Sequence, residues 1–271
     1  PLPHISFVQG VKNVQFLKKR YEALKNLPMF SDIEYTEDRD KLAQWMPLMM
    51  EGRSPHLAIA ASKIDKGTDV NFGELTRKLA SNLETHDNAE LFYRHEVVGF
   101  QQRADKKWEV EVRNLDTDNV ETHVADYIFI GAGGAAIPLL QKTRIEESKN
   151  LGGFPISGAF LVCNKPEIVQ QHDAKVYGKE PPGTPPMTVP HLDRRYVRGK
   201  ESLLFGPFAA IGPKFLKHGS NLYLFRSLNR DNLLTMAAAG VKNLSLVKNS
   251  IQQMMMKNED SMKEFRHFAP D

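Results

Sequence analysis

The feature that most constrains this chain is a short apolar run followed at once by glycines and by a helix-compatible pattern. The run at 127–130, Tyr-Ile-Phe-Ile, is continuous rather than alternating, which predicts a strand buried on both faces, as in a parallel sheet. Gly131-Ala132-Gly133-Gly134 follows directly, and residues 135–142 suit a helix with Pro138 in its first turn. The sequence thus places an expected strand, a glycine turn and an expected helix in direct succession.

The glycine turn has two interpretations. Glycines let the backbone approach a ligand closely, and a helix N-terminus offers free N–H groups to anionic groups. The pattern is not a complete dinucleotide-binding motif, because Ala136 holds the last glycine position and no acidic residue ends a second strand about 20 residues later. The turn therefore indicates either a nucleotide contact or a tight connection from strand to helix.

Hydrophobic spacing predicts further helices and strands along the chain. Helices are expected at 13–27, 39–45, from 71 onward and after 229. Strands are expected at 91–93, 96–101, 107–113, 120–124, 157–162, 174–177, 202–205 and 222–225, and loops at 48–55 and 179–186.

Composition excludes several classes of protein. The chain has 271 residues, 41% hydrophobic and 25% charged, which is typical of a globular protein. Cys163 is the only cysteine, so neither an internal disulfide nor a multi-cysteine metal site is possible. The nine histidines lack zinc-site spacing, and neither a serine-hydrolase elbow nor a P-loop is present, so no metal site is expected.

The charge is mild overall but unevenly distributed. A net charge of +3 does not indicate a nucleic-acid binder. Residues 151–271 carry 16 Lys and Arg against 10 Asp and Glu, and residues 194–230 carry eight basic residues with Glu201 as their one acid. Such an excess can attract an anionic substrate or an anionic membrane, or it can be a solvated basic face.

The densest polar group in the sequence is His191-Leu192-Asp193-Arg194-Arg195, after Pro190. Histidine titrates near neutral pH and suits proton abstraction, while arginine binds carboxylates through paired hydrogen bonds. The same residues could form a surface loop with ion pairs, placed between Pro190 and a strand.

Several longer strings resemble one family, the malate:quinone oxidoreductases, which are FAD-dependent malate dehydrogenases of bacterial membranes. The strings are PHISFV at 3–8, PLMMEGR at 47–53, GTDVNFG at 67–73, IGAGGAAIPLLQK at 130–142, LVC at 161–163, KVYGK at 175–179, VPHLD at 189–193 and LFGPFA at 204–209. The resemblance covers about residues 1–268. It implies a mixed α/β fold of the D-amino-acid-oxidase-like FAD-dependent type. In this fold an FAD domain, here incomplete, is split in sequence, and a substrate domain built on a mixed sheet is inserted.

The resemblance also implies a domain division and an incomplete chain. Residues 1–66 would form a substrate-side or cap segment, 67–150 part of the FAD-binding domain, and 151–271 the substrate domain with C-terminal helices. The family's N-terminal ADP-binding unit, with its own glycine motif, and a C-terminal segment are missing. We therefore expect an interior fragment whose partners include the missing segments of the parent chain.

The implied function is oxidation of (S)-malate to oxaloacetate, with FAD as cofactor and electrons passed to a membrane quinone. The protein would serve the tricarboxylic acid cycle and the respiratory chain, as a peripheral protein on the cytoplasmic side of the bacterial membrane. The alternatives are a flavoprotein that oxidises 2-hydroxyglutarate or an amino acid, or, for this fragment alone, a binding module without catalysis.

The resemblance also suggests residues for the site. For the reaction, His191 would be the base and Arg195 the carboxylate ligand, with Lys214, Lys175 and Tyr177 as further candidates. For FAD, the candidates are Gly131, Ala132, Gly133 and Gly134 along the flavin, Val97 near the adenine, and Asn71. Arg194 stands where the family usually has a threonine, which favours Arg195 as the ligand.

Overall fold

The structure, a computed structural model, describes residues 2–179, 189–197, 199–217, 219–256 and 258–270. They divide into two compact units, each assembled from distant parts of the chain. The first comprises Pro1–Phe72, Ser157–Ala210 and Lys248–Asp271, and the second Gly73–Ile156 and Ile211–Val247. Residues 211–247 thus belong to the second unit, whereas the sequence analysis grouped them with the rest of 151–271.

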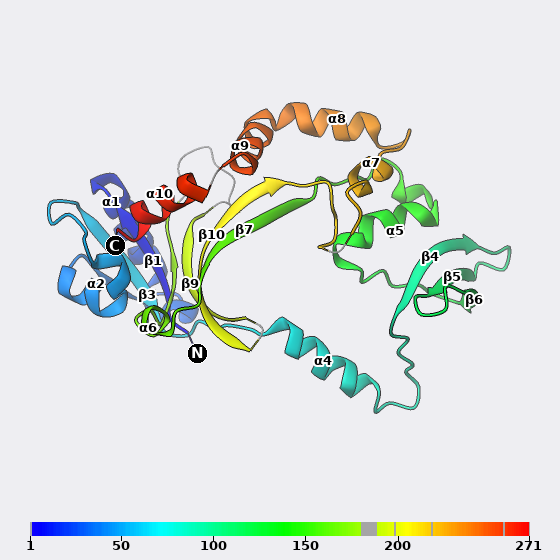
Figure 1. Cartoon of the computed structure of the whole chain (residues 1–271), viewed down its shortest axis with the longest axis horizontal. Helices are drawn as coiled ribbons and strands as arrows, with labels where there is room; N and C mark the ends of the chain where they lie inside the picture. The colour runs from blue at the N-terminus through cyan, green and yellow to red at the C-terminus, as the bar shows by residue number, and fades with distance from the viewer. Residues whose placement is uncertain (1, 180–188, 198, 218, 257, 271) are drawn as a thin grey trace. The chain divides into compact units, whose positions relative to one another are not determined.

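The first unit is built on a mixed seven-stranded sheet (Figure 1). Its strands, in spatial order, are β2 (Glu34–Thr36), β3 (Ile59–Ile64), β1 (His4–Gln9), β8 (Lys175–Tyr177), β9 (His191–Val197), β10 (Lys200–Ile211) and β7 (Ile156–Cys163). β1 and β8 are parallel, while β2–β3, β1–β3, β8–β9 and β9–β10 are antiparallel. The prediction of a mixed α/β fold is confirmed.

Helices flank this sheet. They are α1 (Val11–Leu24), α2 (Arg39–Trp45), α3 (Pro47–Met50), α6 (Pro166–Val169) and α10 (Asn258–Phe268), with a 3₁₀ turn at Pro28–Phe30. The side chain of Asp38 accepts a hydrogen bond from the Lys41 amide at 2.8 Å and so caps α2, whose predicted bounds are confirmed. α9 (Leu244–Met254) begins in the second unit and ends in the first.

One face of the sheet carries the main hydrophobic core. Ile5 and Phe7 of β1, Val176 of β8 and Leu192 of β9 are all almost fully buried there. The core also receives Leu42, Met49 and Phe268 from the helices and Met46 from between α2 and α3. Burial of each large apolar side chain contributes roughly 1.5–3 kcal/mol, so this face provides most of the unit's cohesion.

The opposite face carries a second, smaller apolar cluster beneath α1. There Val14 and Leu17 of α1 pack on Val8 and Ala60. Farther along the same face, the alternate positions of β1, β8 and β9 carry polar and charged side chains. Because successive residues of a strand point to opposite faces, these polar positions alternate along each strand with the residues that enter the core.

The second unit contains a three-stranded antiparallel sheet with helices. Its strands are β4 (His95–Gln102), β5 (Trp108–Asn114) and β6 (Val120–Ala125), in that order. Its helices are α4 (Phe72–Leu83), α5 (Ala136–Thr143), α7 (Tyr223–Ser227) and α8 (Leu233–Lys242), with 3₁₀ turns at Gly133–Ala135 and Glu146–Ser148. The Lys142 ammonium of α5 donates to the Val98 carbonyl of β4 at 2.9 Å.

The apolar run at 127–130 is not a buried strand, and the prediction was wrong. None of the described strands pairs with it, and the exposed fractions of Tyr127 and Phe129 are 80% and 86%. An apolar run becomes a strand only when a neighbouring strand takes up its N–H and C=O groups. The helix predicted after the glycines is present as α5.

Three shorter predictions also fail. Residues 222–225 form the N-cap and first turn of helix α7 rather than a strand, because Ser220 accepts hydrogen bonds from the amides of Leu222 and Tyr223 and starts a turn. Residues 91–93 lead into a turn that includes residue 93 and join neither sheet, and the loop expected from 48 starts inside α3. Residues 180–186 of the predicted loop 179–186 lie outside the described residues.

Candidate active site

The polar string at 191–195 lies within β9. It is therefore part of a strand and not a surface loop that precedes one. Leu192 enters the hydrophobic core, so His191, Asp193 and Arg195 point to the opposite face of the sheet. Arg194 lies on the Leu192 side of the strand, where its guanidinium pairs with Asp173 at 3.1 Å and Glu201 at 2.8 Å.

The strands beside β9 complete this group. In the ladder with β8, Tyr177 pairs with His191 and Lys175 with Asp193. In the ladder of β8 with β1, His4 pairs with Lys175. These six residues are called the polar cluster below: His4, Lys175, Tyr177, His191, Asp193 and Arg195.

Asp69 joins two cations of the polar cluster from the loop before α4. Its Oδ1 lies 3.0 Å from Arg195 Nε and 3.2 Å from Lys175 Nζ, and its Oδ2 accepts from the Tyr196 amide at 3.1 Å. Burial raises the pKa of the Asp69 carboxyl, but the Tyr196 amide and the two cations outweigh it and hold the pKa below its ordinary value. Asp69 therefore stays ionised and holds both cations in place.

Gly67 lets this loop approach the sheet. Its carbonyl accepts a hydrogen bond from the Leu2 amide at 2.8 Å, and a Cβ at this position would collide with the Leu2 carbonyl and lie 2.5 Å from the His4 ring. Only glycine permits so close a contact, and this contact brings Asp69 over the cluster.

The His191 imidazole is held on several sides. Its Nδ1 lies 3.1 Å from the Val189 carbonyl oxygen, and its Nε2 lies 3.6 Å from Asp193 Oδ2. The ring stacks on Tyr177 with centroids 4.8 Å apart and meets Phe160 edge-on at 5.7 Å. Because a carbonyl can only accept, Nδ1 carries hydrogen, and Nε2 is the nitrogen that can take up a proton.

Asp193 is the most buried charged group of the cluster, with 2% of its side chain exposed. Burial raises the pKa of its carboxyl, and the nearby cations and imidazoles only partly oppose this shift. Its Oδ1 is buried without a hydrogen-bond partner among the described residues. Asp193 therefore presents a buried carboxyl group next to the His191 ring, 3.6 Å from its Nε2.

His4 and Tyr177 close the cluster on the β1 side. Their rings are 5.8 Å apart. Burial and the Lys175 charge lower the pKa of His4 against the opposing effect of Asp193, so its imidazole is neutral at pH 7. Burial and Asp193 raise the pKa of the Tyr177 hydroxyl. Both rings are thus uncharged and bound the charged centre of the cluster.

The structure thus brings together four of the predicted reaction residues, His191, Arg195, Lys175 and Tyr177. Lys214 is an exposed residue of the second unit. The sequence analysis did not select Asp69, Asp193 or His4. Asp193 was visible two residues after His191, the spacing that puts both on one face of a strand.

The residues predicted to contact FAD fall in both units. Asn71 lies in the first unit just before α4, and Val97 lies in β4, paired with Val112 beside a bulge. Gly133 has φ +53°, and a Cβ built there meets nothing within 4 Å, whereas one built on Gly134 would collide with the Phe215 carbonyl. The turn before α5 therefore offers bare backbone at Gly133 and is held by packing at Gly134.

Fold and site together describe a mixed α/β protein with a sheet-borne polar cluster suited to an organic anion. The family model for malate:quinone oxidoreductases matches residues 1–271, and the chain belongs to this family. It is 62% identical to "Probable malate:quinone oxidoreductase 2" of Staphylococcus epidermidis and 61% identical to the protein of that name from Staphylococcus aureus, over its whole length in each case.

The chain spans about half the length of these curated relatives, 54% and 55% respectively. Among solved structures, it is similar to the glycerol-3-phosphate dehydrogenase of Bacillus halodurans complexed with FAD. That similarity has a TM-score of 0.48 and 15% identity, and covers 90% of this chain and 40% of the other.

Proposed function

We propose that this chain supplies the substrate-binding part of an FAD-dependent enzyme that oxidises (S)-malate to oxaloacetate and passes the electrons to a quinone. The observation that carries the proposal is the pairing of His191 with the buried Asp193, beside the cations Lys175 and Arg195, in a chain of this family. Oxidation of a 2-hydroxyacid needs both a proton acceptor and cations for the carboxylate, and this cluster contains both.

The proton of the malate hydroxyl goes to Nε2 of His191. The Val189 carbonyl keeps hydrogen on Nδ1, so Nε2 has a free lone pair when the ring is neutral. Asp193, 3.6 Å away, stabilises the imidazolium formed when that proton arrives. Tyr177 and Phe160 fix the plane of the ring, so this step needs no reorientation of the base.

Lys175 and Arg195 orient the carboxylate next to the reacting carbon. Asp69 holds both by ion pairs that compensate one of the two positive charges. Lys175 and Arg195 keep N–H donors beyond those that face Asp69, and these can bind the substrate carboxylate, while the fixed geometry limits how the hydroxyl meets His191.

For FAD, we propose backbone contacts from the turn formed by Gly131, Ala132, Gly133 and Gly134, with Val97 and Asn71 as further contacts. The bare backbone at Gly133 fits close approach of a flat cofactor. When bound, FAD supplies the acceptor for the hydride that leaves C2 of malate. The division into an FAD domain and an inserted substrate domain of the D-amino-acid-oxidase type is part of this proposal.

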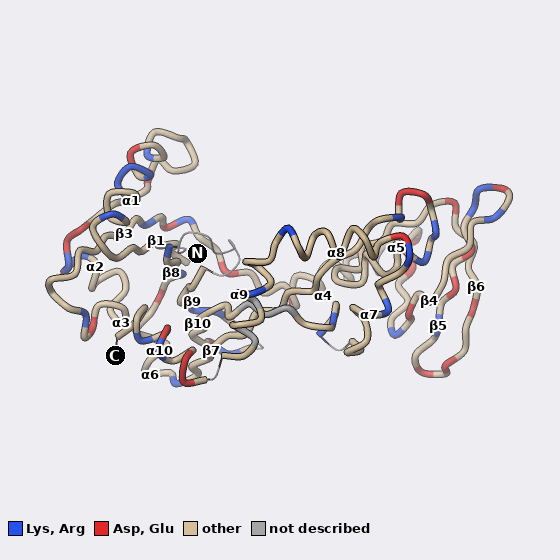
Figure 2. Tube along the Cα trace, turned by 90° about the horizontal axis from the view of Figure 1, so that it is seen from above, with Lys and Arg blue, Asp and Glu red and all other residues tan. Residues whose placement is uncertain are grey.

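We also propose a peripheral contact with anionic lipid, on the cytoplasmic side of the membrane, where quinone is reached. No helix among the described residues is long and apolar enough to span a bilayer. α8 has Lys242 as its one charged residue (Figure 2), and 82% of Leu234 and 67% of Val241 are exposed. Arg226 and Arg230 precede this helix, and apolar side chains flanked by cations suit a lipid surface.

The test is malate-dependent reduction of a quinone analogue by the full-length protein. His191→Ala should lower kcat by about 10²–10⁴-fold, the usual contribution of a general base, and Arg195→Ala should mainly raise KM. Arg194→Ala is the matched control, since that side chain pairs with Asp173 and Glu201 on the other side of β9, and it should leave both constants near wild type.

Three results would count against the proposal. Oxidation of 2-hydroxyglutarate in place of malate would overturn the substrate. Normal turnover in both His191→Ala and Arg195→Ala would overturn the site. A purified full-length protein without flavin absorbance that cannot be reconstituted with FAD would overturn the cofactor.

A further inference from the structure

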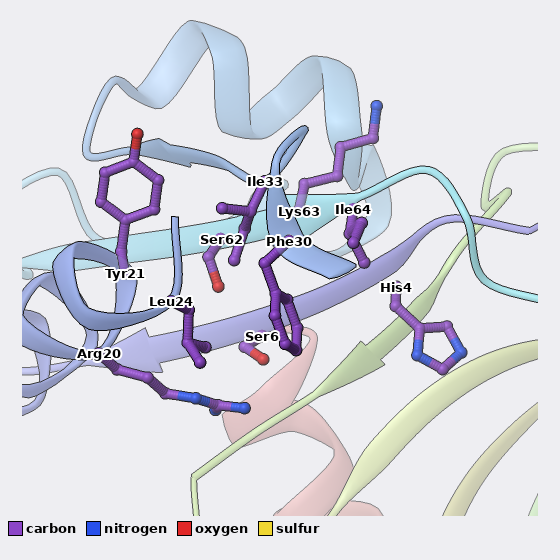
Figure 3. A pocket seen from close by; sticks show the side chains of 10 residues that line it. All are labelled: His4, Ser6, Arg20, Tyr21, Leu24, Phe30, Ile33, Ser62, Lys63 and Ile64. Atoms are coloured by element: carbon purple, nitrogen blue, oxygen red, sulfur yellow. The ribbon is translucent and has the colours of Figure 1, made fainter. Parts of the chain in front are cut away.

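A cavity lies next to the polar cluster, between α1 and the β1–β3 pair (Figure 3). Its volume is about 130 Å³, the size of a small organic acid or a few waters. Ser6 of β1 and Ser62 of β3 face each other across the ladder and line the sheet side. His4, a member of the polar cluster, also lines it, so the cavity and the cluster share a wall.

The cavity lining includes a cation with no counter-ion among the described residues. Arg20 extends from α1 toward Ser6 (Figure 3), and its side chain makes neither an ion pair nor a hydrogen bond within the part of the chain that the structure describes. Lys63 also borders the cavity, but its ammonium points away, 2.9 Å from Asp65 and 5.4 Å from the centre of the Trp45 ring.

Two hydroxyl groups accompany this cation. Neither Ser6 nor Ser62 uses its side chain in a hydrogen bond to the described residues. Ser62 is buried, with 7% of the residue exposed. Both serines line the cavity, so a ligand or water there can take up their hydroxyl hydrogen bonds. Two free hydroxyls beside an unpaired guanidinium match the hydrogen-bonding needs of a carboxylate.

The cations of the polar cluster already face carboxyl groups of the protein. Lys175 and Arg195 carry two positive charges, and the carboxyl groups of Asp69 and Asp193 oppose them. A dicarboxylate therefore needs a further cation for its second end.

We propose that this cavity is a carboxylate subsite, in which Arg20, Ser6 and Ser62 bind the end of a dicarboxylate that lies farther from His191. The role as part of a substrate site rests on the proposed function, whereas the anion site itself does not. Arg20 thereby selects dicarboxylates over 2-hydroxymonocarboxylates of the same length.

The test compares two ligands that differ in one carboxylate and cannot be oxidised at a hydroxyl. Succinate and butyrate are titrated calorimetrically into the full-length protein, as wild type, Arg20→Gln, Ser62→Ala and Lys19→Gln. Lys19 is the matched control, an exposed cation next to Arg20 on α1 that does not line the cavity.

Arg20→Gln should raise the Kd of succinate about tenfold, with that of butyrate unchanged, because one charge-assisted contact is lost at a partly exposed site. Ser62→Ala should raise it less, and Lys19→Gln should leave it near wild type. An unchanged succinate Kd in Arg20→Gln, equal losses for succinate and butyrate, or no succinate binding by wild type would overturn the subsite.

Malate turnover by the wild type separates this proposal from the proposed function. If the wild type oxidises malate but its succinate Kd does not change in Arg20→Gln, the subsite is wrong and the proposed function holds. If the wild type does not oxidise malate but its succinate Kd rises in Arg20→Gln, the proposed function is wrong and the subsite holds.

Discussion

Nε2 of His191 lies 3.6 Å from Oδ2 of Asp193, while Nδ1 of the same ring faces the Val189 carbonyl at 3.1 Å. One imidazole is thus fixed between a backbone acceptor and a buried carboxyl group. Asp193→Asn keeps the shape of that group and removes its negative charge. We expect kcat for malate to fall about tenfold or more, because the imidazolium formed during the reaction loses its stabilising partner.

The same variant should change the pH dependence of stability. Because burial raises the Asp193 pKa above its ordinary value of 3.8, the folded protein keeps a proton that the unfolded chain releases. Wild type therefore loses stability as pH rises from 3.8 through the raised value, and the variant lacks this loss. Urea unfolding at several pH values should show the difference in unfolding free energy moving in favour of Asp193→Asn with increasing pH, and a difference that is constant across this range would contradict the assignment.

Asp69 has the opposite linkage. Its pKa is lowered in the folded state, so its ion pairs stabilise the protein above the ordinary pKa of 3.8 and cease to do so as pH falls through the folded value. Asp69→Asn should cost about 2–4 kcal/mol of unfolding free energy at pH 7, since it leaves the nearly buried Lys175 ammonium without its counter-charge. The loss should shrink in acid.

Asp65→Asn is the control for this measurement. Asp65 also pairs with a lysine, Lys63, but 63% of its side chain is exposed, so the change should stay within about 0.5–1 kcal/mol. Equal losses for Asp65→Asn and Asp69→Asn would show that the Asp69 pairs have no special weight.

In this chain the sequence predicts helices and strands better than it predicts which segments pack against one another. The alternation of Trp108, Val110 and Val112 indicates a strand, and β5 forms there, since period-2 alternation describes a strand's own two faces. The stripe Leu75, Leu79 and Leu83 indicates a helix, and α4 forms, but all three leucines are 43–57% exposed. Periodicity shows which face is apolar and not what covers it.

The candidate site shows the same limit. His191 and Arg195 could be selected from residue type and from the family resemblance, because both lie in one short string. His4 and Asp69 reach the cluster through the β1–β8 register and through a returning loop that only Gly67 allows. Register and loop closure depend on contacts between segments far apart in the sequence, which local patterns do not encode.

Arg53 connects α3 to the end of α10 inside the core. Its guanidinium group donates to the Met49 and Phe268 carbonyls and lies over the Phe7 ring at 4.9 Å, and burial lowers its pKa to about 10. Arg53→Met keeps the volume but leaves two buried carbonyls unpaired, and we expect a loss of about 2–4 kcal/mol in urea unfolding. Arg266→Met, on the exposed side of α10, is the control and should stay within about 0.5 kcal/mol.

The glycine turn before α5 offers a test of the proposed FAD contacts. A Cβ on Gly134 would collide with the Phe215 carbonyl, so Gly134→Ala must displace the turn and should lower the flavin content of the purified full-length protein, measured from its visible absorbance. Gly240→Ala is the control, because a Cβ there meets nothing within 4 Å and alanine favours the helix interior of α8. If Gly134→Ala keeps the full flavin content while its unfolding free energy falls, the turn serves packing alone and FAD is held elsewhere.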